Sequence, residues 1–241
     1  MDQTQVGHRH GAHAEAVEQH LHQGESIRDI ILGMADGLTV PFALAAGITG
    51  AIGASHVVVT AGVAEITAGG LSMGLGGFLA AHSHAEHYAN EQRREAAETE
   101  SIPEEERREI ERIFASYGIA GDELASLVAH ITADKERWVD FMMKFELGLE
   151  QPKRHGAPLS ALRIGGSYVV GGFIPLLPYF LLADAHVAVV WSTVVTLCAL
   201  LAFGGVKGYF TGSGVLRSSL QTALIGGLAA AVAFFFARLV T

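Results

Sequence analysis

Two carboxylates lie inside apolar stretches of this chain, where charged side chains are rare. Asp36 is the one charged residue of the run Ile30–Ile52, and Glu65 is the one charged residue of the run Val57–Ala81. A charge at the centre of a bilayer costs about 3 kcal/mol or more, so such an acid normally faces a partner or a watery path. Because no lysine or arginine lies deep in these runs, the two acids favour a cation or a proton as their partner. The alternative is a structural acid, either protonated or close to the end of a span.

Met73 adds a softer ligand to the same stretch. On a helix it lies about 12 Å beyond Glu65 and about 80° around the axis, so both side chains can face one path. A thioether beside carboxylates favours a soft or borderline metal ion over magnesium or calcium. A lone methionine in an apolar run is otherwise a packing residue.

A second group of acids and thioethers lies in the polar middle of the chain. Several of these residues are spaced three apart, so on a helix the two members of each pair share one face. Helices that each offer such a pair could converge on bound metal ions, as carboxylate bundles do. The alternative is a solvated acidic bundle without a metal. No Glu-x-x-His pair of the di-iron type occurs in the sequence, which favours reversible binding over oxidative chemistry. The candidate ligands are Glu95, Glu98, Glu106, Glu109, Met142, Met143 and Glu146.

The elements that must position these residues are five apolar runs and a polar insert. Each run has about the twenty residues that a membrane helix needs. We therefore predict an all-α membrane protein with five transmembrane helices and a three-helix cytosolic domain inserted between spans 2 and 3. The predicted spans are Ile30–Ile52, Val57–Ala81, Ile164–Ala183, Val187–Val206 and Ser218–Ala237. The predicted parts are a His-rich tail (1–25), spans 1 and 2 (26–85), the acidic metal-binding domain (86–155) and spans 3 to 5 (156–241).

Charge sets the orientation and excludes one class of partner. The segment Glu86–Glu150 holds 17 acidic and 8 basic residues, a net charge of −9, which equals the net charge of the chain. Such a block attracts cations and repels nucleic acid. Basic residues flank the spans on one side, with Arg238 near the C-terminus as the exception, whereas the opposite loops Ala51–His56 and Asp184–His186 carry neither lysine nor arginine. The N-terminus and the acidic insert are therefore predicted to be cytosolic. The His-rich tail is interpreted as a solvated segment or as a weak metal-gathering arm.

Local signals predict where helices begin. Ser26 with Asp29, and Ser101 with Glu104, have the spacing of a capping box at a helix N-terminus. Within the insert, one helix is predicted to end near Tyr117, and a longer one to run from Asp122 to about residue 150.

The most specific stretches of the chain resemble a known family. They are DGLTVPFALAAG at Asp36–Gly47 and AEITAGGLSMGLGGFLA at Ala64–Ala80, supported by the insert ending in FMMKFELGLE. They are similar to the vacuolar iron transporter family of membrane Fe/Mn carriers, and the resemblance covers nearly everything after residue 25. It implies a five-span homodimer that exchanges Fe(II), and often Mn(II), for protons along a path at the two-fold interface. It also implies that Asp36, Glu65 and Met73 line that path, and that the seven candidate ligands form a cytosolic metal-binding domain.

We therefore expect a secondary transporter, not an enzyme, that exports Fe(II) or Mn(II) from the cytosol in exchange for protons and holds no fixed cofactor. Co(II) and Zn(II) stay open, because carboxylate and thioether ligands accept several of these ions. Without a plant-like targeting extension, we expect a prokaryotic inner membrane, or a vacuolar membrane in a eukaryote. One alternative is a membrane-anchored iron-binding or ferroxidase protein. Another is a structural membrane protein with an acidic interaction domain.

Overall fold

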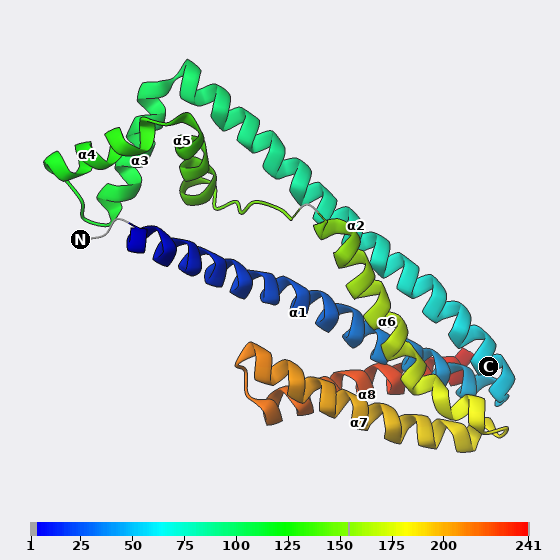
Figure 1. The fold of residues 1–241 in the computed structure, drawn as a ribbon. Helices are drawn as coiled ribbons and strands as arrows, with labels where there is room; N and C mark the ends of the chain where they lie inside the picture. The colour runs from blue at the N-terminus through cyan, green and yellow to red at the C-terminus, as the bar shows by residue number, and fades with distance from the viewer. Residues whose placement is uncertain (1–3, 154, 241) are drawn as a thin grey trace. The chain divides into compact units, whose positions relative to one another are not determined.

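A computed structural model describes the backbone of residues 4–153 and 155–240, and the side chains of residues 24–153 and 155–239. Helices make up this part of the chain, and its only β-type pairing is one isolated antiparallel bridge, Ala54 with Asp184. Figure 1 shows the helices in chain order. They are α1 (Thr4–Ala51), α2 (Ser55–Ser101), α3 (Pro103–Ser116), α4 (Gly121–Thr132), α5 (Lys135–Phe141), the π-helical turn η1 (Met142–Glu146), α6 (Gly156–Leu181), α7 (Ala185–Thr211) and α8 (Val215–Val240).

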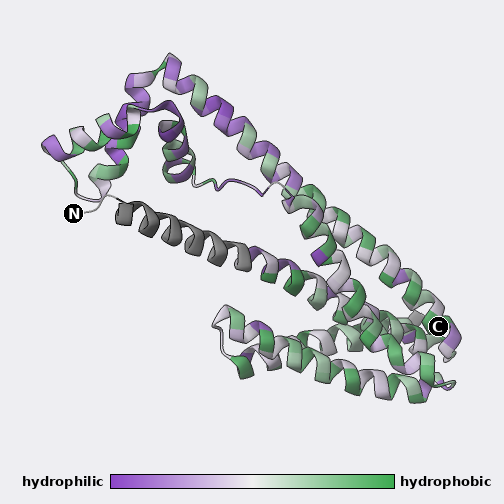
Figure 2. Cartoon of the chain, viewed as in Figure 1, coloured by the Kyte–Doolittle hydropathy of each residue, from purple (hydrophilic) through white to green (hydrophobic). Residues whose placement is uncertain are grey.

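The chain divides into two compact units. Unit 1 comprises Met1–Phe78 and Ala157–Thr241, and unit 2 comprises Leu79–Gly156. Helix α2 passes from one unit into the other without a break. Figure 2 shows that the first half of α2 is largely hydrophobic and the second half is largely hydrophilic.

Unit 1 carries the predicted membrane helices. Five helices are long and apolar enough to cross a bilayer, and they coincide with the five predicted spans. All five exceed the roughly 20 residues that the hydrocarbon core requires. The predicted number and order of the spans are therefore confirmed. The observed segments are Gly24–Ala51, Ser55–Ser101, Gly156–Leu181, Ala185–Thr211 and Val215–Leu239.

Glycines let the helices of unit 1 approach closely. A methyl group added at Gly74 of α2 would lie 3.0 Å from the carbonyl oxygen of Ala161 on α6. One added at Gly204 of α7 would lie 2.7 Å from the carbonyl oxygen of Ser218 on α8. Small residues at these contacts allow backbone-to-backbone packing, which is how helices associate in lipid.

The helix start predicted at Ser26 is misplaced, whereas the start predicted at Ser101 lies two residues before the observed first residue of α3 but forms no capping box. Ser26 lies within α1, and Ser101 is the last residue of α2. The Ser101 hydroxyl donates a hydrogen bond to the carbonyl oxygen of Ala97 at 2.9 Å, so it satisfies the end of one helix instead of the start of the next. Helix α3 begins at Pro103 without a side-chain cap. Proline needs no acceptor for a backbone N–H, which removes one of the demands that a cap serves.

The prediction of one long helix from Asp122 to about residue 150 was wrong. Asp134 lies in extended conformation and accepts a hydrogen bond from the backbone N–H of Arg137 at 2.9 Å. This N-cap starts α5 as a separate helix, so α4 ends at Thr132. The chain then widens into the π-helical turn η1, which follows directly on Phe141.

The core of unit 2 explains this compact arrangement. Side chains from α3, α4, α5 and η1 meet in one hydrophobic cluster, which a single straight helix over residues 122–150 could not form. The buried members of this cluster are Ile110, Val128, Ile131, Trp138 and Met142. The prediction that residues 1–25 form a solvated or metal-gathering tail rests on side chains almost all of which lie outside the described ones.

Candidate functional site

Three glutamates from three elements of unit 2 converge. Glu95 comes from α2, Glu106 from α3 and Glu146 from η1, and one carboxylate oxygen of each lies within 4.8 Å of the others. The side chains of Glu95 and Glu106 are deeply buried, with exposed fractions of 1% and 3%. We call these three residues the three-glutamate cluster. Among the described residues, the Oε2 atoms of Glu95 and Glu106 have no hydrogen-bond partner.

Burial without a partner makes these oxygens informative. A buried carboxylate oxygen that lacks a hydrogen bond is costly, because it has lost its water and gained nothing in return. Two such oxygens, on residues whose carboxylates converge with that of the more exposed Glu146, fit a divalent cation, which is bound by carboxylate oxygens in proteins. The geometry therefore supports reversible binding of a metal ion at the three-glutamate cluster.

The π-helical turn places the third glutamate. The backbone N–H of Leu147 donates to the carbonyl of Met142 at 3.1 Å, five residues back instead of four. This wider turn ends at Glu146, and such turns are frequent at functional sites. It also alters the face that residues 143 and 146 were predicted to share, because that prediction assumed a regular α-helix.

The two predicted thioether ligands are fully buried in hydrophobic surroundings. Met142 packs with Ile110 and Trp138, and Met143 packs with Tyr88 and Val139 in a separate cluster. Packing accounts for the burial of both side chains, so their role as metal ligands stays a prediction.

The remaining predicted carboxylates lie beside the cluster and are held by arginines. Glu109 pairs with Arg112 at 2.8 Å, and it also forms a hydrogen bond with Glu146. Glu98 lies 3.5 Å from Arg94, whose guanidinium also reaches Glu95 at 3.3 Å. These arginines offset part of the negative charge that several neighbouring acids accumulate.

The crowding of acids changes their protonation. Burial raises the pKa of Glu106 to about 7, and the negative charge of Glu95 adds to the effect. Burial likewise raises the pKa of Glu146 to about 7, helped by its hydrogen bond with Glu109 and by that residue's charge. Near neutral pH these two carboxyl groups are therefore partly protonated, and a metal ion must displace their protons in order to bind.

In unit 1 the structure gives Glu65 a partner that the sequence analysis missed. The hydroxyl of Tyr168 on α6 donates a hydrogen bond to Glu65 Oε1. Among the described residues, Glu65 Oε2 is buried without a hydrogen-bond partner. A signal for Tyr168 was present in the sequence, since a phenol inside an apolar run needs a polar partner. The residue that the phenol would meet could not be known without the packing.

The other two predicted path residues are placed by helices of the same unit. Asp36 is half-buried on α1 and precedes Gly37, which lies directly against the backbone of Tyr168. Met73 is half-buried on α2 and precedes Gly74, which packs on α6. Helix α2 is continuous between Glu65 and Met73, so these two side chains keep a separation of about 12 Å along the axis.

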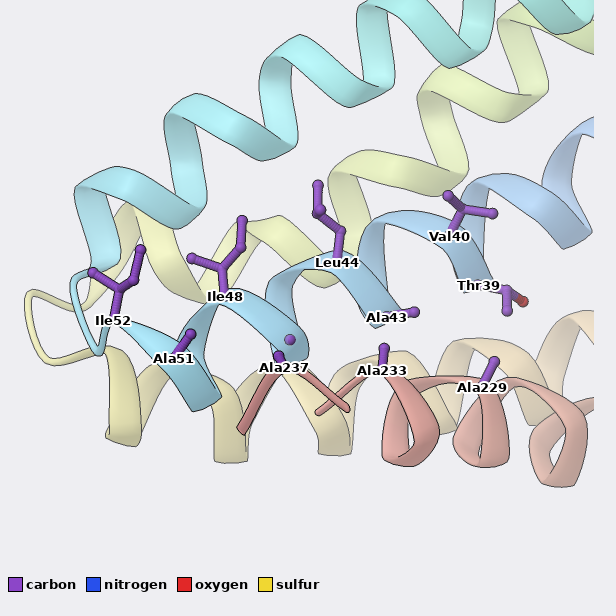
Figure 3. A pocket seen from close by; sticks show the side chains of 11 residues that line it. Thr39, Val40, Ala43, Leu44, Ile48, Ala51, Ile52, Ala229, Ala233 and Ala237 are labelled. Atoms are coloured by element: carbon purple, nitrogen blue, oxygen red, sulfur yellow. The ribbon is translucent and has the colours of Figure 1, made fainter. Parts of the chain in front are cut away.

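An apolar groove in unit 1 serves as a contrast. It has a volume of about 530 Å³ and lies between α1 and α8. Figure 3 shows the alanines of α8 turned toward α1. Among the described residues, those that line this groove offer no charged ligand for a cation. Its lining residues are Thr39, Val40, Ala43, Leu44, Gly47, Ile48, Ala51, Ile52, Ala229, Ala233 and Ala237.

Comparison with known proteins gives one consistent result. Residues 27–238 match the model of the VIT family. The chain is 53% identical over 223 residues to "Vacuolar iron transporter 1" of Arabidopsis thaliana, which covers 92% of this chain and 89% of that protein. It is 49% identical to "Vacuolar iron transporter 1" of Oryza sativa subsp. japonica, covering 98% of this chain and 92% of that protein. It is 36% identical to "Protein CCC1" of Saccharomyces cerevisiae, covering 88% of this chain and 68% of that protein.

These relatives come from plants and a fungus. They give no support to the expectation of a prokaryotic inner membrane. The family resemblance found in the sequence is confirmed, and it extends over the five apolar helices and the insert between them.

Proposed function

The chain belongs to the VIT family, and we propose that it is an integral membrane transporter that moves Fe(II), and also Mn(II), in exchange for protons. The observation that carries this proposal is the three-glutamate cluster, in which one carboxylate oxygen of each residue lies within 4.8 Å of the others and the two buried members, Glu95 and Glu106, each keep an oxygen without a hydrogen-bond partner in the described part of the chain. The names of the relatives support iron as the cargo. In this proposal the protein moves an ion and transforms no substrate.

Capture is assigned to unit 2. Glu95, Glu106 and Glu146 would hold the ion, while Glu98 and Glu109 supply further negative charge beside them. Met142 and Met143 would bind if the hydrophobic clusters around them open, and their thioethers would then favour iron over magnesium or calcium. The absence of lysine and arginine from the loops Ala51–His56 and Asp184–His186 supports a cytosolic location for this unit.

Passage through the membrane is assigned to unit 1. Asp36 and Met73 would receive the ion first and Glu65 would receive it last, because these are the acids and the thioether on the apolar helices and Met73 lies closer than Glu65 to the unit 2 end of α2. Glu65 is the residue at which metal and proton exchange, since its Oε2 atom is buried and free of a protein partner in the described part of the chain. When the ion leaves toward the far side, Glu65 takes up a proton and is neutral again. Because capture is assigned to unit 2 on the cytosolic side, metal transport runs out of the cytosol, and into a vacuole if the source is a eukaryote.

A homodimer is part of the same proposal, as the family resemblance implies. The mass of the detergent-solubilised chain, measured by light scattering with correction for detergent, would test it. A monomer under conditions that retain transport would contradict the proposal of a homodimer.

The decisive experiment measures metal-driven proton flux in proteoliposomes. Glu65→Gln removes the charge with almost no change of shape, so it should abolish the flux. Glu123→Gln is the matched control, because Glu123 is exposed at the start of α4. It should leave the flux at the wild-type level. Wild-type flux in Glu65→Gln would contradict the proposed exchange.

The ferroxidase alternative gains no support from the cluster. The candidate metal site among the described residues holds three glutamates and no histidine. Oxygen consumption by the full chain with Fe(II) would test this alternative directly, and we expect no consumption above that of protein-free iron.

A further inference from the structure

The structure brings the hydroxyl of Tyr168 to Glu65. It lies on α6, 103 residues away from Glu65 in the sequence, and it donates to the Oε1 atom. The tyrosine side chain is buried, with an exposed fraction of 3%. The contact therefore depends on the packing of α6 against α2.

Glycines on two neighbouring helices make room for this tyrosine. A methyl group at Gly69, one turn after Glu65, would lie 2.5 Å from the Tyr168 hydroxyl oxygen and 2.6 Å from Cζ. On α1, Gly37 lies directly against the backbone of Tyr168. Side chains larger than hydrogen at these two places would displace the ring or the helix. Tyr168 on α6 is thus packed against both α1 and α2. Its neighbour on α1 is Gly37, the residue that follows Asp36.

The hydrogen bond leaves the carboxylate of Glu65 with two unequal oxygens. Oε1 is held by Tyr168, whereas Oε2 is buried and has no hydrogen-bond partner in the described part of the chain. A side chain fixed at one oxygen can present the other in a constant direction. Without the phenol, the glutamate would be free to turn about its last torsion, whose energy profile is broad.

We propose that Tyr168 is a positioning residue for Glu65, and that its hydroxyl aims the free carboxylate oxygen at the site where metal and proton exchange. The inference rests on the proposed exchange at Glu65 and adds the residue that makes it efficient. Tyr168 acts through Glu65 and is not itself a metal ligand.

The same helix supplies a matched control. Tyr179 also lies on α6 and also has an exposed fraction of 3%. Its hydroxyl lies 3.0 Å from the hydroxyl of Thr49 and so has a neutral partner. Removing either hydroxyl leaves one buried ring in place and breaks one hydrogen bond. The two variants differ in whether an acid loses its partner.

The test compares Tyr168→Phe, Tyr179→Phe and Glu65→Gln as full-length proteins in proteoliposomes. Tyr168→Phe should lower the maximal rate of Fe(II) transport about tenfold, the size expected for losing one hydrogen bond to a charged acceptor. The KM for Fe(II) should stay within about twofold of wild type, because capture occurs elsewhere. The number of protons moved per metal ion should also fall. Tyr179→Phe should leave both the rate and this ratio unchanged.

Each other result has a distinct meaning. A Tyr168→Phe protein with the wild-type rate and ratio overturns the inference. So does an equal loss in both tyrosine variants, or a loss of rate at constant proton-to-metal ratio, because a structural role predicts these. Wild-type transport by Glu65→Gln would overturn the proposed function itself, whatever the tyrosine variants do.

A second variant keeps the inference testable if Tyr168→Phe does not fold. Gly69→Ala keeps the tyrosine but places a methyl group 2.5 Å from its hydroxyl oxygen, so the ring or the helix must shift and the contact with Glu65 is disturbed. It should give the same fall in maximal rate and in protons per metal ion, at unchanged KM. Wild-type behaviour of Gly69→Ala in a protein of normal thermal stability would overturn the inference.

Discussion

The two acidic sites of this chain differ in which groups stabilise their buried carboxylates. In unit 2, three glutamates stand within 4.8 Å of one another, and arginines at their edge offset part of the charge. In unit 1, a single glutamate on an apolar helix receives one neutral donor, Tyr168. Unit 2 can concentrate several acids, because arginines offset part of their charge and partial protonation of Glu106 and Glu146 near neutral pH removes more of it. An apolar helix tolerates few charged side chains. The orientation of its single acid is therefore set by a hydrogen bond and not by ion pairs.

This difference assigns separate roles to the two sites in the proposed function, affinity for the metal ion in unit 2 and exchange in unit 1. A dense cluster gives affinity, since each added carboxylate strengthens the attraction for a cation. In the proposed function, a single acid with one positioned oxygen gives exchange, because it can hold either a proton or part of the coordination of a metal, but not both. Variants that separate affinity from exchange therefore test the comparison.

The largest effect is expected from the single acid. Glu65→Gln should abolish metal-driven proton flux and yet bind Mn(II) at the three-glutamate cluster with wild-type affinity. Titration calorimetry on the full chain in detergent, beside the flux assay, would measure both quantities. Loss of both together would show that the two sites do not act separately.

The next effect concerns the cluster. Glu106→Gln should weaken metal binding by about 10- to 100-fold, because one of three converging ligands is replaced by a neutral amide. The same change should stabilise the metal-free chain by about 1 kcal/mol at pH 8, since it removes one of several buried like charges. Amide hydrogen exchange of unit 2, measured in the full chain during thermal unfolding, would report the free energy of unfolding.

These opposite signs are specific to a binding site. Glu123→Gln, at an exposed position of α4, is the control and should change neither the affinity nor the stability. A Glu106→Gln chain that is both less stable and unaltered in affinity would assign the cluster a structural role.

A smaller effect is expected from pH. The pKa values of Glu106 and Glu146 are raised to about 7 by burial and by neighbouring acids. Protons therefore compete with the metal, and affinity should increase about tenfold or more between pH 6 and pH 8. The metal-free fold has the opposite trend. A carboxyl group whose folded pKa exceeds its unfolded value favours folding below about pH 4.5, and this contribution is lost as pH rises to about 7.

Calorimetry at several pH values, in buffers with different ionisation enthalpies, would count the protons released when metal binds. Release of less than about one proton per metal ion at pH 6.5 would contradict the raised pKa values.

The sequence alone predicts the spans well and the contacts poorly, for physical reasons. Length and hydropathy suffice for a membrane helix, because lipid imposes a thickness on every span. Asp36 and Glu65 were identifiable by their rarity in apolar runs. The convergence of Glu95, Glu106 and Glu146 was suggested by helical spacing, but it depends on how three elements pack. Tyr168 as the partner of Glu65 depends on a contact 103 residues distant, which no local pattern encodes.

Local rules failed where two signals compete. The spacing of Ser101 and Glu104 suggested a cap, but α2 continues through Ser101 and the next helix begins at a proline. The helix predicted over residues 122–150 is interrupted, because Asp134 offers an N-cap at its centre. The π-helical turn has no sequence signature at all, and it decides where Glu146 points.

The smallest effect tests whether this interruption matters for the cluster. Asp134→Ala removes the N-cap of α5 and should destabilise unit 2 by about 1 kcal/mol. Ser101→Ala is the control, since its hydroxyl bonds back to Ala97 and starts no helix, so it should cost less than about 0.5 kcal/mol. Because α5 leads directly into the turn that ends at Glu146, the loss of the cap should lower metal affinity slightly, by less than about tenfold. Flux at saturating metal should not change, since Asp36 and Glu65 lie in the other unit. A lower flux at saturating metal in Asp134→Ala would mean that the two units are coupled more tightly than their separate chemistry requires.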